Sequence, residues 1–161
     1  MVNPFSPNDR KVRDAQRNWI YKEVEPDIFA VCTVYQGIWH DNGRFRTYQA
    51  GDEITYEKMA IGFRHRLSKV VYRNCYKRHK KLIDMSGSLE GNGDDRHYHF
   101  NFFIKRPEWW TFRDFETLFK ETWSKYDWAH KSPKYAVKFQ ERTGDCVGYG
   151  LKEGSQTLLV F

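Results

Sequence analysis

The sequence RHYHFNFFI, residues 96–104, decides the fold predicted for this chain. Its aromatic density is typical of a β-strand, and strand side chains alternate between two faces. His97 and His99 therefore share one face, while the aromatic residues at the even-numbered positions share the other. The aromatic face is apolar enough to pack against helices, which leaves the histidine face for a ligand. Two histidines on a half-solvated strand can also be structural polar residues. The residues around them must therefore decide between a ligand site and a structural role.

The stretch before this strand predicts a β-hairpin, because Asn92-Gly93 is a strong signal for a two-residue turn. With these two residues as the loop, facing residues have numbers that sum to 185, so Glu90 faces Asp95 and joins the histidine face. A three-residue loop would reverse this alternation and offer Asp84 or no carboxylate. Two imidazoles and one carboxylate form an open donor set for a divalent ion.

The chain has 161 residues, a length that suits one domain with a sizeable core. We expect a single domain over residues 1–161, with an N-terminal extension at 1–26 and the core at 27–154. Aromatic residues make up 17% of the sequence, more than a minimal core needs, so some are expected to form exposed stacking surfaces. A core that is merely rich in aromatic residues would explain the same composition.

Positive charge is concentrated in one part of the chain. The formal net charge is +6, and basic residues gather between Arg64 and Lys81. Such a cluster favours a polyanionic partner, in particular nucleic acid, although a charged helix face is often only solvated. The candidate DNA-binding residues, in a polar loop, on the basic helix and on a later strand, are Arg44, Arg46, Arg66, Lys69, Arg73, Lys77 and Lys138.

The cysteine pattern favours an intracellular, reduced protein. Cys32, Cys75 and Cys146 are odd in number and widely spaced, which argues against a disulfide framework. The sequence shows neither a signal peptide nor an apolar run of the length that crosses a membrane, so we expect no membrane partner.

Hydrophobic periodicity predicts an α+β fold, in which a central antiparallel sheet carries helices mainly on one face. A strand at 28–35 is the first firm element, and a long polar loop follows at 38–53. A helix from Thr55 onward has one basic face and an apolar stripe that includes Phe63 and Val70. The other predicted elements are a helix at 9–24, a hairpin around 92–93, a helix at 111–125 opened by Thr111 and Asp114, a strand at 134–141, a helix at 146–153 and a strand at 158–161.

Tyr149 and Lys152 lie three residues apart in the predicted helix at 146–153 and share one of its faces. Tyr149 is a candidate nucleophile, because a neighbouring ammonium and a metal-polarised phosphate can make attack by a phenol feasible. Tyr-x-x-Lys is a short pattern, and it recurs at Tyr135 and Lys138. That copy lies in a predicted strand, where residues three apart point to opposite faces, so Tyr135 is predicted to lie in the core.

Three features together resemble the motifs of HUH endonucleases: His-hydrophobic-His on a strand, an acidic residue on the preceding strand, and Tyr-x-x-Lys on a later helix. More narrowly, the sequence is similar to the nuclease domain of rolling-circle replication initiators of the circovirus-like group. In that group the tyrosine motif commonly continues as Lys-Glu-Gly, as it does at Lys152-Glu153-Gly154. The resemblance spans about residues 29–154. The histidines precede the tyrosine, whereas conjugative relaxases usually show the reverse order.

The resemblance implies an enzyme that nicks and rejoins single-stranded DNA at an origin, such as one in a stem-loop, and so initiates rolling-circle replication. It implies Mg²⁺ or Mn²⁺ on Glu90, His97 and His99, and Tyr149 as the nucleophile that forms a 5′-phosphotyrosine link. Lys152 would offset charge or orient the phosphate. The implied partners are the DNA origin and a helicase domain or host replication proteins. The implied compartment is the host nucleus for a eukaryotic virus, or the cytoplasm for a bacterial or archaeal element.

Two other interpretations remain open. A single-tyrosine HUH transposase would use the same fold without an ATPase, although the Tyr149 to Lys152 spacing followed by Glu-Gly favours the initiator. A non-catalytic nucleic-acid-binding module would need only the basic and aromatic side chains. The sequence contains no Gly-x-x-x-x-Gly-Lys-Ser/Thr phosphate loop, so either the nuclease acts alone or a helicase domain lies outside this sequence.

Overall fold

The structure is a computed structural model that describes residues 7–34, 37–39, 45–47, 53–91, 98–152 and 158–159. Helices and strands are interspersed along the chain. In order, they are α1 (Pro7–Glu23), β1 (Ile28–Thr33), β2 (Gly37–Trp39), β3 (Phe45–Thr47), α2 (Glu53–Tyr72), α3 (Asn74–His79), β4 (Met85–Glu90), β5 (His99–Ile104), α4 (Phe112–Ser124), β6 (Val137–Glu141), α5 (Cys146–Gly150) and β7 (Leu158–Leu159).

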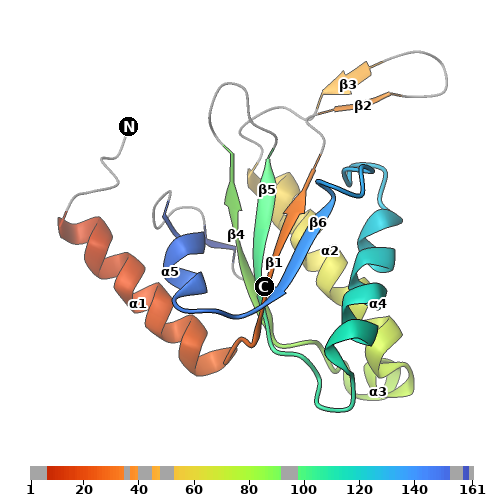
Figure 1. The fold of residues 1–161 in the computed structure, drawn as a ribbon, viewed down its shortest axis with the longest axis horizontal. Coiled ribbons are helices and arrows are strands. Elements are labelled where there is room, and N and C mark those ends of the chain that lie inside the picture. Colours follow the sequence, from red (N-terminus) through yellow and green to blue (C-terminus); the bar gives the residue numbers. More distant parts are fainter. Residues whose placement is uncertain are drawn as a thin grey trace.

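A five-stranded antiparallel sheet with the strand order β6-β1-β5-β4-β7 forms the centre of the described fold (Figure 1). This arrangement confirms the predicted α+β class. β5 pairs with β1 on one side and with β4 on the other, so the histidine strand is the middle strand of the sheet. β2 and β3 pair as a separate two-stranded sheet within the segment that was predicted to be a loop.

The even-numbered face of β5 packs against α2 and α4. Phe100 and Phe102 are fully buried there, and Tyr98 next to them is also buried. Phe63 of α2 stacks on Phe102 at 5.6 Å between ring centroids, and it meets Trp123 of α4 edge-on at 5.0 Å. Because each buried aromatic ring removes a large apolar area from water, these contacts dominate the core. The predicted aromatic face of the histidine strand is therefore confirmed.

α1 and α5 cover part of the opposite face of the sheet (Figure 1). Ile20 of α1 and Val147 of α5 form a second buried cluster with Phe29 of β1 and Phe103 of β5. The larger core lies under α2 and α4, as the prediction of helices mainly on one face requires, but the cover provided by α1 and α5 was not predicted. The helix of the predicted N-terminal extension is thus packed on the sheet.

Helix boundaries follow local chemistry more closely than hydrophobic periodicity. The predicted capping pair of α4 is confirmed, because the Asp114 backbone N–H donates to Thr111 Oγ1 at 3.1 Å. The helix predicted from Thr55 breaks at Arg73, where φ is +46°, and continues as α3. Val70 was assigned to its apolar stripe, but this side chain is 37% exposed. The stripe prediction is wrong at that position.

Two predictions near the C-terminal end of the sheet are also wrong. β6 begins at Val137, so Tyr135 precedes the strand and is 56% exposed instead of lying in the core. α5 ends at Gly150 and is followed by a turn, so it is shorter than the predicted helix at 146–153.

All three cysteines lie in the described ranges and are free thiols, with Cys75 exposed and the other two buried. Among the helices of the described ranges, none has the length and apolar character needed to cross a membrane.

Candidate active site

The register of β4 and β5 brings a carboxylate and an imidazole face to face. Glu90, the last residue of β4, pairs directly with His99, the first residue of β5. The predicted partner Asp95 is therefore wrong, and Asn92-Gly93, the predicted turn, lies outside the described residues. Glu90 nevertheless lies on the predicted face, because moving its partner from 95 to 99 shifts the register by an even number of residues. His97 and Asp95 lie outside the described residues.

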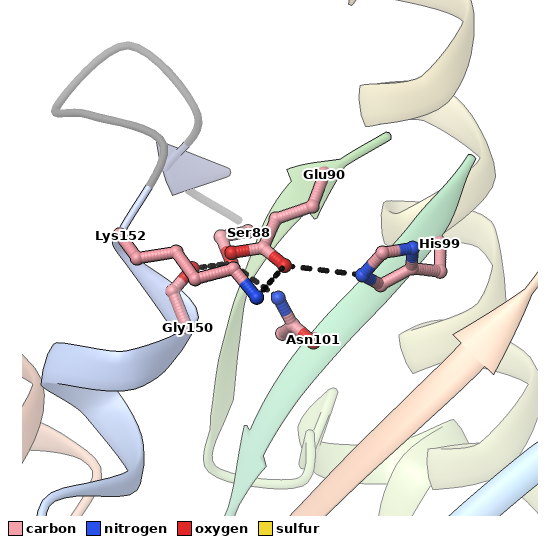
Figure 2. A network of polar contacts seen from close by, with 6 residues as sticks. All are labelled: Ser88, Glu90, His99, Asn101, Gly150 and Lys152. Atoms are coloured by element: carbon pink, nitrogen blue, oxygen red, sulfur yellow. Dashed lines mark hydrogen bonds and ion pairs between the residues drawn. The ribbon is translucent and has the colours of Figure 1, made fainter. Parts of the chain in front are cut away.

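Glu90 is buried between two nitrogen atoms from different elements (Figure 2). Its side chain is only 1% exposed. The Oε2 atom lies 3.1 Å from His99 Nε2 and 3.4 Å from Lys152 Nζ. The Oε1 atom is also buried and has no hydrogen-bond partner among the described residues. The carboxylate thus links the histidine strand to the segment that follows α5.

Burial alone would raise the pKa of the Glu90 carboxyl. Hydrogen bonds from His99 and Asn101, together with the positive charge of Lys152, outweigh burial and hold this pKa below its ordinary value. Glu90 is therefore a carboxylate at neutral pH, although it is shielded from water. A buried anion of this kind attracts cations strongly.

Lys152 connects Glu90 to Tyr149. Its Nζ atom lies 4.2 Å from the centroid of the Tyr149 ring, within the range of a cation–π contact. Burial alone would lower the pKa of Lys152, but hydrogen bonding to Tyr149 and the charge of Glu90 raise it above its ordinary value. The Tyr149 side chain is 59% exposed and touches Phe29 edge-on at 6.3 Å. A substrate can therefore reach the Tyr149 hydroxyl while the Tyr149 ring packs against Phe29 of the sheet.

The sheet holds α5 at the distance that these contacts require. Ser88 Oγ donates to the Gly150 carbonyl oxygen at 2.5 Å, and Asn101 Nδ2 donates to Ser88 Oγ at 3.3 Å (Figure 2). A Cβ atom at Gly150 would lie 2.5 Å from Phe103 Cζ, so only glycine allows this close approach. Sequence reasoning missed Ser88 and Asn101, although both share the alternation of Glu90 and His99 and could have been found from it.

The open part of this sheet face continues from His99 toward β6. Thr33 of β1 pairs with His99, and Val31 pairs with Asn101 on one side and with Lys138 of β6 on the other. Lys138 is exposed, and its alternation puts it on the face of Glu90 and His99. Among the predicted DNA-binding residues whose side chains the structure describes, Lys138 is the one whose register aligns it with the candidate site.

The basic residues of the helices lie elsewhere. Arg66 and Lys69 are exposed on α2, which packs against the opposite face of the sheet, and Arg66 lies over the ring of Tyr126 at 4.5 Å. Exposed Arg73 and Lys77 lie at and beyond the end of α2. The structure therefore does not bring these four residues together with Glu90. Arg46 is in β3, where only its backbone pairing is described, and Arg44 lies outside the described residues.

Two of the three predicted metal ligands, Glu90 and His99, lie close enough together to bind one metal ion. An oxygen of Glu90 and a nitrogen of His99 lie 3.1 Å apart, and mixed donors of this kind suit Mn²⁺ and can bind Mg²⁺. The buried Oε1 atom of Glu90 offers a further oxygen. Within the described ranges alone, no cluster of three or more His, Cys, Asp or Glu side chains could hold a metal ion. The third predicted ligand, His97, is not part of those ranges.

Comparisons of the chain with protein-family models, with curated proteins and with solved structures found no match. The functional interpretation therefore rests on the residues and their geometry.

The lowered pKa of Glu90 predicts how stability depends on pH. A carboxyl whose pKa is lower in the folded than in the unfolded chain stabilises the fold above the ordinary value of 4.5, and this contribution is lost as the pH falls through the folded pKa. Below about pH 4.5, the free energy of unfolding should therefore fall more steeply for the wild type than for Glu90→Gln. Urea denaturation between pH 3 and pH 7 measures both curves. Parallel curves would show that this carboxyl titrates alike in the folded and unfolded chains.

Proposed function

We propose that this chain is a metal-dependent HUH endonuclease that nicks and rejoins single-stranded DNA through a 5′-phosphotyrosine link, and that it initiates rolling-circle replication. The observation that carries the proposal is the continuous contact from Tyr149 through Lys152 and Glu90 to His99. These residues come from three separate segments, and they are the residue types that phosphodiester transfer to tyrosine requires. A surface tyrosine and lysine that met by chance would not be expected to join a buried carboxylate, as Lys152 does here.

In the proposed reaction, the Tyr149 oxygen attacks the scissile phosphorus and loses its proton, and a bond forms between phosphorus and the tyrosine oxygen. The bond from phosphorus to the 3′ oxygen breaks, and this oxygen takes up a proton and leaves as a free 3′-hydroxyl. The Lys152 ammonium, beside the Tyr149 ring, stabilises negative charge on the phenolate and the phosphate. Rejoining is the reverse reaction and needs no other reactant.

Glu90, His97 and His99 would hold Mg²⁺ or Mn²⁺, which supplies positive charge next to a phosphate oxygen. Before such an ion binds, Glu90 already carries hydrogen bonds that keep it ionised. His99 Nε2 donates to the Glu90 carboxylate, so this nitrogen would have to exchange its N–H for a lone pair, with the proton on Nδ1, when it binds the ion. The protein thus keeps the Glu90 carboxylate ionised before any cation binds.

The open sheet face offers a path for the DNA strand. The residues beside His99 on β1 and β6, Thr33, Val31 and Lys138, are not buried, whereas the part of the same face near Phe29 and Phe103 lies under α1 and α5. A single strand that follows the open part would place a phosphate beside Tyr149. Lys138 would then contact the backbone of the strand.

A non-catalytic nucleic-acid-binding module is the second candidate, and one observation favours it. Lys152 forms an ion pair with Glu90 Oε2, the oxygen that faces His99. In a structural network this pair would simply neutralise a buried carboxylate. The two functions differ in whether the chain forms a covalent product with DNA.

The identity of the nucleophile is the first prediction for this function. Tyr149→Phe keeps the ring against Phe29 and Lys152 but deletes the attacking oxygen, so it should form no covalent adduct and no nick. The assay uses a labelled pool of single-stranded DNA with a randomised centre, Mn²⁺ and a denaturing gel that separates adduct from free DNA. Lys152→Ala should be slowed by roughly 10²-fold, because a charge that stabilises the transition state is removed.

Tyr135→Phe is the matched control, because Tyr135 belongs to the other Tyr-x-x-Lys copy and is similarly exposed. It should form the adduct at the wild-type rate. An adduct that persists in Tyr149→Phe would falsify the assignment of the nucleophile. Nicking by the wild type without any adduct would mean that water attacks, and the protein would then be an ordinary nuclease.

The metal ligands are the second prediction. His97→Ala and His99→Ala should each abolish Mn²⁺-dependent nicking while most of the affinity for single-stranded DNA remains, because both lose an imidazole ligand. Isothermal titration with Mn²⁺ and a fluorescence binding assay with labelled DNA measure the two properties separately. His130→Ala is the control histidine, since its backbone N–H bonds to Thr33 while its ring bonds to the Ser132 N–H. If both variants nick DNA at the wild-type rate, His97 and His99 are not the metal ligands.

The path of the DNA strand is the third prediction. Lys138→Gln should weaken DNA binding and reduce the slope of log affinity against log salt by about 0.7, the value for one phosphate contact on a single strand. Lys69→Gln removes the same charge from the exposed face of α2, across the sheet, and should leave the slope unchanged. Equal effects of both substitutions would show that DNA also contacts the helices, as the sequence alone suggested.

A further inference from the structure

We infer that the N-terminal helix α1 positions Tyr149 for the reaction, because Arg17 and Tyr21 of α1 hold Asp145, the residue that caps α5. The inference rests on the proposed role of Tyr149 and adds positioning residues to it. Sequence reasoning gave α1 no part in the site. The two helices are more than a hundred residues apart in the chain and lie side by side on the sheet (Figure 1).

Every acceptor atom of the Asp145 carboxylate is engaged. Oδ1 accepts hydrogen bonds from the Tyr21 hydroxyl at 2.7 Å and from the Gly148 backbone N–H at 3.0 Å. Oδ2 lies 2.8 Å from Arg17 Nε. The carboxylate is thus shared between the start of α5 and two side chains of α1. A shift of α1 along or away from α5 would break one of these contacts.

Asp145 also controls the backbone of the proposed nucleophile. The Tyr149 backbone N–H donates to the Asp145 carbonyl oxygen at 3.1 Å, which is the first helical hydrogen bond of α5. Gly148 leaves room for the cap, because a Cβ atom there would lie 2.2 Å from Asp145 Oδ2. Asp145 therefore fixes one end of α5, while Ser88 fixes the other end through Gly150. Tyr149 lies between the two anchors.

The charges agree with this assignment. Burial alone would raise the pKa of the Asp145 carboxyl, but the hydrogen bonds from Gly148 and Tyr21 and the interaction with Arg17 hold it below its ordinary value. Burial, followed by the hydrogen bond to Asp145, raises the pKa of Tyr21 to about 12. The Tyr21 ring also lies under the guanidinium groups of Arg17 and Arg142, at 5.8 Å and 5.3 Å. All partners keep their charge or proton at neutral pH.

These contacts are partly exposed, and this separates positioning from stability. The side chains of Arg17 and Asp145 are 40% and 46% exposed, and exposed ion pairs contribute little to global stability. The buried cluster of Ile20, Val24 and Val147 already holds the two helices together. The Asp145 contacts instead fix the rotation of α5 about its axis and its position relative to α1. Small displacements of a reacting group are costly, since a shift of about 1 Å can slow a reaction roughly 10²-fold.

The test compares Arg17→Met and Tyr21→Phe with the wild type. Single-turnover adduct formation on the randomised single-stranded DNA pool with Mn²⁺ should fall at least roughly tenfold at saturating DNA. The DNA concentration for half-saturation should stay the same, because neither side chain binds the strand. Arg17→Lys keeps the charge and should recover part of the rate. Tyr21→Phe keeps the ring in place, so it also tests the inference if Arg17→Met does not fold.

Arg13→Met is the matched control, since Arg13 is an arginine of the same helix that pairs within the helix, with Asp9 at 3.3 Å. It should cleave at the wild-type rate. Hydrogen exchange of the Tyr149 backbone N–H gives a readout that does not require activity. It should speed up several-fold in Arg17→Met and Tyr21→Phe but not in Arg13→Met, because α5 loses an anchor.

The outcomes separate this inference from the proposed function. If the wild type forms no adduct, the proposed function fails, while faster exchange at Tyr149 still shows that α1 holds α5. If the wild type forms an adduct that needs Tyr149, and Arg17→Met and Tyr21→Phe match it in both rate and exchange, the inference is overturned. A change in half-saturation with an unchanged maximal rate overturns it as well, because Arg17 would then contact DNA.

Discussion

The buried carboxylate of Glu90 is the group on which the candidate site depends. An ionised carboxylate that loses its water costs several kcal/mol unless partners replace the lost hydration. Here His99 comes from the neighbouring strand and Lys152 from the segment after α5, so the charge is satisfied only when the sheet register and the position of α5 are both correct. The same contacts bring the ionisable side chains of the candidate site together at one end of the sheet. Stability and the proposed activity therefore share one electrostatic constraint.

The odd-numbered face of β5 changes character along its length, which explains why the site lies at one end. His99, Asn101 and Phe103 follow one another on this face, from polar to fully apolar. Their partners on β4 are Glu90, Ser88 and Ser86. At the Phe103 end the face is apolar enough to pack α1 and α5, whereas at the His99 end it is polar and partly open. A single strand thus supplies a core on one face, and both a helix-packing surface and a candidate site on the other.

Sequence reasoning succeeded where side-chain alternation decides the outcome. The aromatic face of β5, the shared face of Glu90 and His99, and the start of α4 at Thr111 all follow from patterns within a few residues. It failed where contacts between distant segments decide. The turn type gave Asp95 as the partner of Glu90, but the register that β4 keeps with β5 along their whole length pairs Glu90 with His99.

Other failures have the same origin. Val70 fits the helical stripe, but it is exposed while the next residue, Val71, is buried, so the buried face of α2 runs through Val71. Tyr135 was assigned to a strand, yet the backbone before Val137 forms a turn, and the Ala136 carbonyl oxygen accepts a hydrogen bond from the Thr33 N–H instead. A helix at residues 9–24 could be predicted, but its packing on α5 could not, because the contacts of Arg17 and Tyr21 to Asp145 join segments that no local pattern relates.

These long-range contacts matter because α5 is short. A helix of five residues is far too short to be stable in isolation, since nucleating the first turn is unfavourable and few backbone hydrogen bonds follow it. Its orientation must therefore come from its neighbours: α1 at Asp145, β4 at Gly150, and Phe29 and Phe103 beneath it. A short helix held at both ends can present an exposed tyrosine with little freedom to move, while the face of the ring that a substrate needs stays open. As a consequence, the geometry of the site depends on residues from distant parts of the chain, including α1, which carries none of the motif residues.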